Sequence, residues 1–541
     1  MSFTTNPEGQ SLIQGTIDAV SQTVDITSPN SGTSVIQITG TWVGSIVVEG
    51  SNDSTNWSPI SSVNSDSKLF QPAITESGSY VSPTNGFKLL RLISDSWTSG
   101  TASISVHGAD AASVVRTDTT IRGSSGNIAE VDIRGNQLIK VGESNQLDIW
   151  GRIRTSLPTT LFELNFNFND RPLSMHTLLE TGGTSTYDYN TSGVNMAVTT
   201  ASGSRVIRQT RRYFRYITGK GVNVFTTSVC EPAKAGLVQE WGFFDDNDGM
   251  FVRYDNDGLK AVVRSSTSGS PVDIVIDQAD WNLDKMDGTG PSGFVLDPAK
   301  YNVWIVDFAW QGAGGVRFGI YNNAEVIYFH QYKPSNDLEA PFTRIAVLPV
   351  RYEIRNESAT ASASTMYQGT LGIVVDDSGN LSEAAVQFSA SRGVSLKSIG
   401  TTFTPLLAIR PKLTFNGNEN RVPIRVDDLE VTSETQVIQY QIIKNATLTG
   451  ASFNSVSDHS AMEFDIAATS YTGGEKISEG YVLANSQGNR VNSGSATQAI
   501  SKLNYLGLNI QGTEAENIVI VARTITSTSN SLAVIGWEEF Q

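Results

Sequence analysis

The chain contains a single cysteine, Cys230, among 541 residues. One thiol forms neither an intrachain disulfide nor a cysteine-based zinc site, so scaffolds held together by such bonds are excluded. We expect Cys230 to be a small buried apolar group on a strand over residues 222–230. Histidine is also scarce, and its positions are widely separated: His107, His176, His330 and His459. This scatter predicts no metal site and no proton relay.

Basic residues are few relative to acidic ones. Lys and Arg total 38 against 54 Asp and Glu, which gives a formal net charge of -16. Nucleic-acid binding draws most of its affinity from Lys and Arg that neutralise phosphates, so we expect no nucleic-acid partner. Apolar runs of transmembrane length are missing, and residues 1–8 lack the basic and apolar regions of a signal peptide. We therefore expect synthesis in a cytoplasm and no membrane insertion.

Ordered catalytic motifs are missing as well. The sequence has no nucleophile elbow, no phosphate-binding loop and no histidine pair at metal-binding spacing. Acidic residues are plentiful in the middle of the chain, at Glu240, Asp245, Asp273, Asp307 and Glu325. Glycoside hydrolysis needs two carboxyl groups paired across a groove, and abundance alone does not predict such a pair. Asp307 lies between two apolar residues and is the main candidate for a buried acid; we favour a hydrogen-bonded structural role for it, no enzymatic activity and no cofactor.

Strand patterns fill the chain instead. Between residues 237 and 353, apolar runs alternate with acidic glycine turns at 245–249 and 255–258. Asn-Gly and Asp-Gly pairs accept the positive φ of tight hairpin turns, so this order predicts an antiparallel meander, and a second one follows over 301–330. No amphipathic helical run of three turns is evident. The predicted fold class is all-β, with several antiparallel β-sandwich or jelly-roll domains in tandem and a short β-rich neck.

Changes in strand pattern divide the chain into five segments. They are an N-terminal tail (1–10), a small β-sandwich attachment domain (11–112), a β-rich neck (113–156), a lectin-like β-sandwich (157–356) and a jelly-roll-like β-sandwich (357–541). The boundary between the last two is expected at an Ala-, Ser- and Thr-rich stretch over 358–364, which has the composition of a loop.

The neck contains a loose repeat of about a dozen residues, in which Ile-Arg pairs recur at 121–122, 133–134 and 153–154. Such a narrow segment cannot bury its apolar faces alone and is more stable when wound with copies of itself. We therefore predict a homotrimer joined through residues 117–156. A linker with two isolated hairpins remains the alternative interpretation.

The turn at 245–249 has the oxygen-rich composition of a calcium loop. Its glycine stands at the fifth position and its flanks are strands, so it does not match an EF-hand. We favour an ordinary hairpin turn and no metal, with calcium bound to an exposed acidic turn as the alternative. Sugars stack on exposed tryptophans and bond to polar turns. We therefore expect Trp281, Asp245 and Asp248 to form a weak glycan-binding surface on the outer turns of this domain.

One cluster in the sequence is both basic and aromatic. It contains Arg205, Arg208, Arg211, Arg212 and Arg215, with Tyr213, Phe214 and Tyr216. In isolation it would indicate a site for nucleic acid or a sulfated glycan. Along a strand, however, Arg211, Tyr213 and Arg215 share one face, and nearby acids would form salt bridges with the arginines. We favour this structural interpretation.

Spaced elements between residue 149 and the C-terminus carry a family resemblance. They are Val206 to Arg211 with Tyr216 and Lys220, Gly242 to Asp245 with Asp248 and Gly249, Trp281 to Gly288, Val306 to Trp310, Val316 to Gly319, Leu348 to Ile354 and Gly536 to Glu539. This stretch resembles β-sandwich virion structural proteins of tailed bacteriophages, a family with concanavalin A- or laminin-G-like domains that is also seen in some large DNA viruses. No catalytic residues come with the resemblance.

The resemblance implies a non-enzymatic appendage subunit of a phage particle, in a tail fibre or near the baseplate, made in the host cytoplasm. Its expected partners are its own copies, other virion proteins of the tail, baseplate or capsid, and host surface glycan. A capsid decoration or head fibre protein is one alternative, and a tailspike polysaccharide depolymerase is another. A bacterial cell-surface glycan-binding protein is a third, and the missing export signal counts against it.

Overall fold

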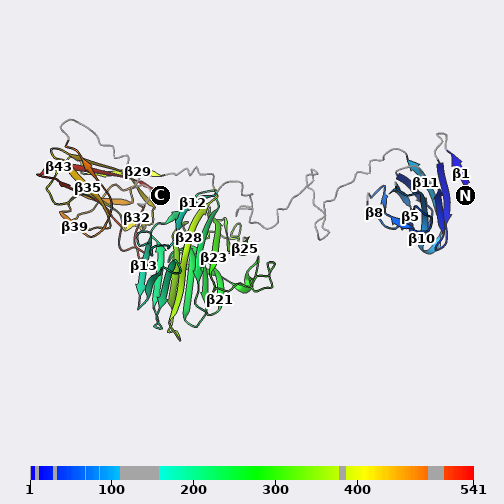
Figure 1. Cartoon of the computed structure of the whole chain (residues 1–541), viewed down its shortest axis with the longest axis horizontal. Coiled ribbons are helices and arrows are strands. Elements are labelled where there is room, and N and C mark those ends of the chain that lie inside the picture. The colour runs from blue at the N-terminus through cyan, green and yellow to red at the C-terminus, as the bar shows by residue number, and fades with distance from the viewer. Residues whose placement is uncertain are drawn as a thin grey trace. The chain divides into compact units, whose positions relative to one another are not determined.

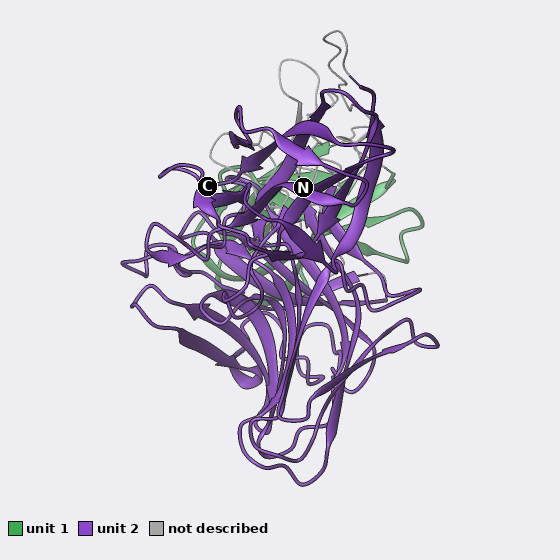
Figure 2. Cartoon of the chain, turned by 90° about the vertical axis from the view of Figure 1, so that its left-hand side faces the viewer, with its two compact units in different colours: residues 1–140 green, residues 141–541 purple. Residues whose placement is uncertain are grey.

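A computed structural model gives the fold and describes residues 2–5, 11–27, 33–67, 69–84, 86–109, 158–323, 325–376, 385–484 and 505–541. The chain divides into two compact units, residues 1–140 and 141–541 (Figure 2). Both units are built from antiparallel sheets, so the predicted all-β class is confirmed. Within the described ranges, the one helical turn is η1 (Gln278–Asp280), and no helix has the length and hydrophobicity needed to cross a bilayer. The predicted neck, with its trimer-forming segment 117–156, lies outside the described residues.

The first unit contains a small β-sandwich, here called the N-terminal sandwich. One sheet has the order β1 (Ser2–Thr5), β2 (Ser11–Ile17), β11 (Ala102–Ala109), β4 (Thr33–Thr39), β9 (Gly78–Pro83), β7 (Ser62–Asn64) and β8 (Phe70–Gln71). The other has the order β3 (Thr23–Thr27), β10 (Leu89–Gly100), β5 (Trp42–Ser51) and β6 (Ser58–Ile60). Alternate apolar residues such as Ile36, Leu92 and Ile104 form the core. Part of the predicted tail is therefore a strand: β1 pairs with β2, which satisfies its backbone groups along that edge.

The central sandwich covers residues 158–376 and has two large sheets. The β23 sheet has the order β14 (Thr184–Asp188), β15 (Gly193–Val198), β28 (Ser364–Val375), β18 (Val222–Val229), β23 (Asn302–Ala309), β24 (Gly315–Asn322) and β25 (Glu325–Tyr332), and β12 (Thr159–Leu164) also pairs with β28. The β19 sheet has the order β13 (Met175–Glu180), β16 (Arg205–Thr210), β27 (Val350–Asn356), β19 (Leu237–Phe244), β20 (Gly249–Asp255), β21 (Gly258–Ser265) and β22 (Val272–Asp277). A separate short pair joins β17 (Phe214–Arg215), which follows β16 in the sequence, to β26 (Val347–Leu348), which precedes β27. Both predicted meanders are confirmed, as β19–β20–β21 and β23–β24–β25, and Gly258 closes a tight turn with φ of +106°.

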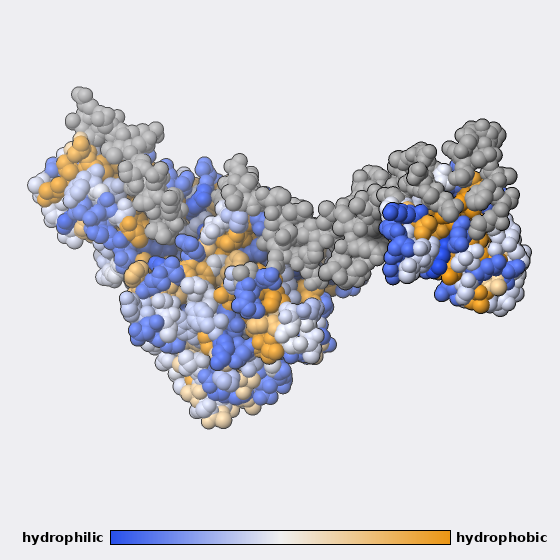
Figure 3. All heavy atoms as spheres, turned by 45° about the vertical axis from the view of Figure 1, so that its right-hand side comes forward, coloured by the Kyte–Doolittle hydropathy of each residue, from blue (hydrophilic) through white to orange (hydrophobic). Residues whose placement is uncertain are grey.

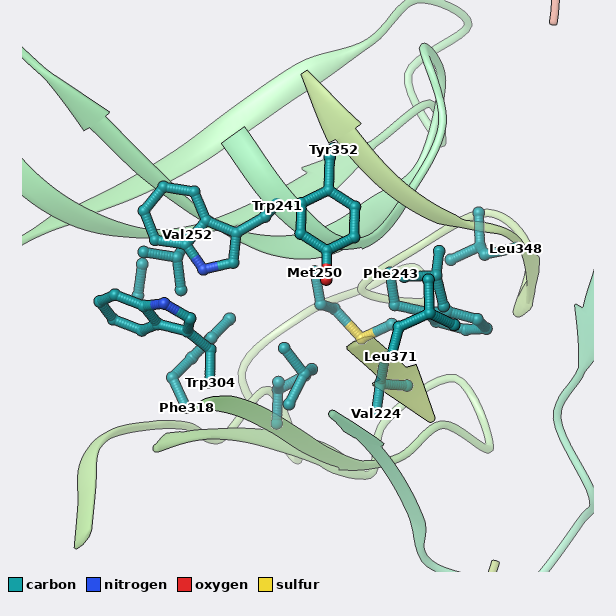
Figure 4. Packing of buried hydrophobic residues seen from close by; sticks show 14 of the residues in the cluster. Val224, Trp241, Phe243, Met250, Val252, Trp304, Phe318, Leu348, Tyr352 and Leu371 are labelled. Atoms are coloured by element: carbon teal, nitrogen blue, oxygen red, sulfur yellow. The ribbon is translucent and has the colours of Figure 1, made fainter. Parts of the chain in front are cut away.

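The core of the central sandwich lies between these two sheets. Trp241 from β19 meets Trp304 from β23 with ring centroids 4.8 Å apart, and Phe243 meets Phe308 at 5.3 Å. Figure 4 shows Trp241 and Trp304 facing each other across the gap between the sheets. Aromatic pairs of this kind combine a large buried area with favourable tilted ring geometry. Because side chains alternate along a strand, Glu240 points to the opposite, outer face of β19.

The boundary of the central sandwich lies later than expected. Residues from 357 onwards were assigned by sequence to the C-terminal domain, but β28 pairs with β12, β15 and β18 and runs among the central strands (Figure 1). Met366, Leu371 and Ile373 from β28 are buried in the same core as Trp241. The Ala-, Ser- and Thr-rich stretch before β28 is thus a connection inside one sandwich, because the core needs these apolar side chains.

The C-terminal sandwich covers residues 385–541 and has its own core. One sheet has the order β29 (Val386–Ser391), β43 (Ser529–Glu539), β34 (Ile424–Ser433) and β41 (Tyr505–Leu506), with β30 (Lys397–Ile399) paired to β43. The other has the order β37 (Asn454–Ser455), β38 (Met462–Asp465), β31 (Thr404–Pro411), β42 (Ile518–Thr524), β35 (Ile438–Lys444) and β40 (Glu475–Val482). Two short pairs are β32 (Thr414–Phe415) with β33 (Asn418–Glu419) and β36 (Thr447–Thr449) with β39 (Ser470–Thr472). Ile409, Ile520 and Trp537 lie in the core between the sheets.

Candidate functional site

The arginine-rich segment connects the central and C-terminal sandwiches. Arg211 Nη1 lies 2.7 Å from Glu516 Oε1, and the Arg212 guanidinium lies 3.8 Å from the centre of the Tyr505 ring. A planar guanidinium bonds a carboxylate and stacks on an aromatic ring with little loss of hydration, which suits it to contacts between domains. These arginines bind protein groups, as do Arg205, Arg208 and Arg215, so the structural role of the cluster is confirmed. The expected continuous strand is wrong, because residues 211–213 lie between β16 and β17.

Glu516 is the buried acceptor of this junction. Its side chain is 4% exposed, and Lys444 Nζ lies 3.4 Å from Oε2, the oxygen that Arg211 does not contact. Burial alone would raise the pKa of Glu516, but Lys444 and Arg211 outweigh it and hold the pKa below its ordinary value. His176 lies beside the pair, and burial with the charge of Arg211 lowers its pKa to about 4. The junction therefore contains an ionised carboxylate and a neutral imidazole at pH 7.

Two of the carboxylates in the acidic turn at 245–249 are turned away from solvent, whereas Asp246 is exposed. Asp245 and Asp248 are 5% and 0% exposed. Asp245 Oδ1 accepts hydrogen bonds from the amides of Asn247 at 2.8 Å and Asp248 at 3.0 Å, and burial raises its pKa. Asp248 accepts from the Ser266 amide at 3.1 Å and from the Arg344 amide at 2.8 Å. The expected exposure of Asp245 and Asp248 is wrong, because Asp245 completes the hydrogen bonding of its own turn and Asp248 bonds to the segments that contain Ser266 and Arg344.

Trp281 does not present a face to solvent either. It follows η1, is 2% exposed, and stacks on Phe329 of β25 with centroids 4.0 Å apart. Its indole nitrogen donates to the Ile276 carbonyl at 3.4 Å. The expectation of an exposed tryptophan is therefore wrong. A flat apolar ring is more stable against Phe329 in the core than in water, even though its chain neighbours are polar.

A charge ladder crosses the outer face of the β19 sheet. Its nitrogen–oxygen pairs are Arg205–Glu353 at 2.8 Å, Arg351–Asp246 at 2.6 Å, Arg355–Glu240 at 2.6 Å, Arg253–Glu240 at 2.6 Å and Arg264–Asp273 at 2.7 Å. Glu240 and Glu353 are register partners on adjacent strands and are 1% and 2% exposed. Neighbouring carboxylates are what a glycoside hydrolase requires.

The protonation state of the ladder suits a structural role. Burial alone would raise the pKa of Glu240, but Arg355 and Arg253 outweigh it and hold the pKa below its ordinary value. Asp273 behaves in the same way, with Arg264 and Arg253 as the opposing charges. A general acid needs a carboxyl group that stays protonated near neutral pH, which requires a raised pKa. These carboxylates are ionised and bonded to arginines instead.

Asp307 is a second buried acid, on β23. Its Oδ2 accepts from Arg317 Nη2 at 2.5 Å and from the Tyr328 hydroxyl at 2.8 Å. Asp307 and Arg317 are register partners on neighbouring strands, which explains why a charged residue interrupts an apolar strand. The predicted burial and hydrogen bonding of Asp307 are confirmed.

The remaining candidates from the sequence have ordinary surroundings. Cys230 is 3% exposed, and burial raises the pKa of its thiol, as expected for an inert buried residue. Burial also lowers the pKa of His330 to about 4. In the part of the chain that the structure describes, no group of three or more His, Cys, Asp or Glu residues is arranged to hold a metal ion.

A cleft of about 710 Å³ lies where the acidic turn faces the C-terminal sandwich. Its central-sandwich wall includes Asp245, Asn247 and Arg344, and its C-terminal wall includes the β32–β33 hairpin and Phe540. Figure 3 shows hydrophilic and hydrophobic residues interspersed over the visible face of the molecule. Single exposed apolar residues are normal on protein surfaces, so this cleft, with its mixed polar and apolar lining, is the better candidate for a ligand site.

Sequence reasoning missed Arg344 and Glu516, which are central to the cleft and to the junction. Arg344 bonds to Asp248, 96 positions away, and Glu516 bonds to Arg211, 305 positions away. Neither residue stands in a motif or in a clear strand pattern. The excess of arginines at 205–215 was the only signal in the sequence that acidic partners had to exist.

Comparisons with known proteins do not assign this chain to a family. No protein-family model and no curated protein matches the chain. Among solved structures, an endo-β-1,4-glucuronan lyase from the fungus Trichoderma reesei is 9% identical and covers 40% of this chain and 95% of its own, with a TM-score of 0.29. A β-1,3-glucanase from Mycobacterium marinum is 12% identical over 40% and 98%, with a TM-score of 0.29, and the Emp47p carbohydrate recognition domain is 12% identical over 40% and 96%, with a TM-score of 0.27. Similarity of this degree gives no information on activity or ligand.

Proposed function

We propose that this chain is a non-enzymatic structural protein of a tailed phage particle, an appendage subunit of the tail fibre or baseplate region that contacts host surface glycan. The observation that carries the proposal is the junction of Arg211, Arg212, Glu516 and Tyr505, which holds two sandwiches as one compact unit. Domains within a chain move relative to each other unless their contact is extensive. A projecting appendage benefits from such a rigid connection, and the resemblance of residues 149–541 to virion structural proteins supports the same function.

Electron microscopy of intact particles tests the location. Particles bearing an affinity tag at the C-terminus of this chain would be labelled with gold-conjugated antibody, with untagged particles as the control. We expect label at the tail tip or baseplate. Label on the capsid would favour the head fibre or capsid decoration alternative, and tagged chain that is absent from purified particles would contradict a virion function.

The proposed assembly is a homotrimer joined through residues 117–156. Light scattering coupled to size exclusion should give three times the mass of one chain for the intact protein. Deletion of 117–156 should give the mass of one truncated chain, because the sandwiches carry their own cores and the repeated strands are the proposed contact. An intact monomer, or a truncated protein that remains trimeric, would show that this segment does not join the subunits.

The tailspike alternative predicts a different outcome in a hydrolysis assay. We expect no new reducing ends when the protein is incubated with capsular polysaccharide and lipopolysaccharide from a susceptible host. The physical reason is that Glu240 and Asp307 are buried and bonded to arginines, and that Arg355 and Arg253 hold the pKa of Glu240 below its ordinary value, whereas a general acid needs a raised pKa. Cleavage that disappears with Asp307→Asn, while the variant keeps the melting temperature of the parent, would make the depolymerase the better assignment.

A further inference from the structure

The cleft between the central and C-terminal sandwiches contains an arginine in an unusual setting. Asp248, which is 0% exposed, accepts from the backbone amide of Arg344 at 2.8 Å and from its Nε at 3.3 Å. The Ser266 amide also donates to this carboxylate, at 3.1 Å from the same Oδ1 that accepts from the Arg344 amide. A buried carboxylate with three donors is rigid, so it holds the Arg344 side chain by its base.

The outer end of Arg344 is available to a ligand. Its side chain is 41% exposed, and it lines the cleft. Within the described part of the chain, its terminal nitrogens Nη1 and Nη2 make no hydrogen bond or ion pair with protein. The two terminal N–H groups of a guanidinium bind a carboxylate with two parallel bonds, which is a stronger and more selective contact than a lysine makes.

The other arginine of the cleft has a structural role. Arg421 Nη2 bonds to Glu419 at 2.5 Å and to the Ile510 carbonyl at 3.0 Å, and its guanidinium lies over the Tyr213 ring at 4.7 Å. These contacts fix the C-terminal wall against the central sandwich. Arg344 is thus the cation that the cleft can offer to a ligand.

Besides Glu419, whose carboxylate is paired with Arg421, the rest of the lining suits hydroxyl groups. Asn247, Asn416 and Gln541 lie in its lining, and side-chain amides both donate and accept hydrogen bonds. Phe415 is half-buried in the same lining and offers an apolar surface of the kind that packs on a sugar ring. A volume of about 710 Å³ lies within the range of roughly 300–1,000 Å³ usual for small-molecule sites.

We infer that this cleft binds an acidic saccharide, with Arg344 paired to the carboxylate of a uronic acid residue. The inference rests on the proposed contact with host surface glycan and names its site and its ligand class. Asp248 positions Arg344, and the amides of the cleft bond to the neutral sugar hydroxyls. The ligand bridges the two sandwiches, because the lining residues come from both.

Calorimetric titration of the full-length chain tests the site. The probes are trisaccharides of galacturonic acid and of glucuronic acid, each with its carboxyl-reduced neutral counterpart. We expect an acidic trisaccharide to bind and its reduced form to bind at least roughly ten-fold more weakly, since charged hydrogen bonds contribute more than neutral ones. Added salt should weaken binding of the acidic form only, because the ion pair is partly exposed.

Two variants distinguish a specific contact of the ligand with Arg344 from a general effect of the protein's positive charge. Arg344→Gln should weaken the acidic trisaccharide by roughly ten-fold or more and remove the preference over the reduced form. Arg523→Gln removes the same charge from an exposed position outside the cleft and should leave binding unchanged. Equal melting temperatures for both variants would show that folding is not the cause.

Three results would overturn the site. They are equal affinity for the acidic trisaccharide and its reduced form, unchanged affinity of Arg344→Gln for the acidic trisaccharide, and no binding of either acidic trisaccharide. Adsorption of the parent protein to host-envelope polysaccharide is measured in parallel. Adsorption without trisaccharide binding would reject this cleft and leave the proposed glycan contact in place. If the parent protein neither binds the trisaccharides nor adsorbs to the polysaccharide, the proposed glycan contact itself would be rejected.

Discussion

Replacing Glu240 by alanine is expected to lower the free energy of unfolding of the central sandwich by about 3–5 kcal/mol. Glu240 is 1% exposed and accepts from Arg253 Nε at 2.6 Å and from Arg355 Nη1 at 2.6 Å. The variant leaves two largely buried guanidinium groups without their common partner. Arg253 keeps its pair with Asp273, and Arg355 keeps its pairs with Glu353 and Glu357. The donors that pointed at Glu240 nevertheless stay buried without an acceptor, which costs far more than the net contribution of an exposed pair.

Differential scanning calorimetry on the full-length chain measures this loss, because several domains make a single two-state transition inadequate. Glu357→Ala is the matched control: Glu357 also accepts from Arg355, at 3.1 Å, but its side chain is 61% exposed. That surface pair should contribute at most about 1 kcal/mol. Similar losses for the two variants would mean that burial does not determine the strength of the ladder.

The effect of Glu240 depends on pH with a defined sign. Its pKa in the folded protein lies below the ordinary value of 4.5. Its contribution to stability is therefore fully present above pH 4.5 and is lost as the pH falls through the lower, folded-state pKa. The difference in the free energy of unfolding between the parent and Glu240→Gln should shrink as the pH is lowered from 4.5 through the folded-state pKa of Glu240. A difference that grows on acidification would show that Glu240 is protonated in the folded protein.

Replacing Glu516 by alanine should separate the unfolding of the central and C-terminal sandwiches and lower stability by about 3 kcal/mol. The carboxylate is 4% exposed and bonds to Arg211 at 2.7 Å, to Lys444 at 3.4 Å and to the Gly507 amide at 3.3 Å. Its removal leaves two cations facing each other across the junction. Repulsion and lost hydrogen bonding both act against docking.

Calorimetry again provides the measurement: besides the transition of the N-terminal sandwich, we expect one joint transition of the central and C-terminal sandwiches in the parent and two in the variant. Glu463→Ala is the control, since Glu463 pairs at 2.6 Å with Arg410, whose side chain is 38% exposed. An exposed pair of this kind contributes little, so the joint transition should persist. Separate transitions of the central and C-terminal sandwiches in the parent would contradict a rigid junction.

Features that depend on neighbouring residues were predictable from the sequence. The acidic turns and the alternating apolar residues on either side predicted β19–β20–β21 with its turns in place. The same pattern predicted that Asp307 is buried on a strand and that Cys230 is buried. Period-two alternation and turn chemistry act over a few residues, so the signal is local and survives without knowledge of the fold.

Trp281 and Asp248 were mispredicted for a common reason. Both stand among polar residues that resemble an exposed turn, yet Trp281 packs on Phe329 and Asp248 bonds to Arg344. Their partners lie far away in the chain and belong to other loops or strands. A residue's local context does not say which distant surface will cover it.

The sequence by itself determined the all-β class, the meanders and the structural role of the arginines at 205–215, because these follow from side-chain alternation, turn conformation and the excess of acids over bases. Only the tertiary structure decided that β28 belongs to the central sandwich, that Glu516 meets Arg211, and that Arg344 faces a cleft. Sheet register and domain docking are selected by total burial and charge pairing over the whole chain. The residues that meet in this way are far apart in the sequence, and the residues next to each of them do not indicate its partner.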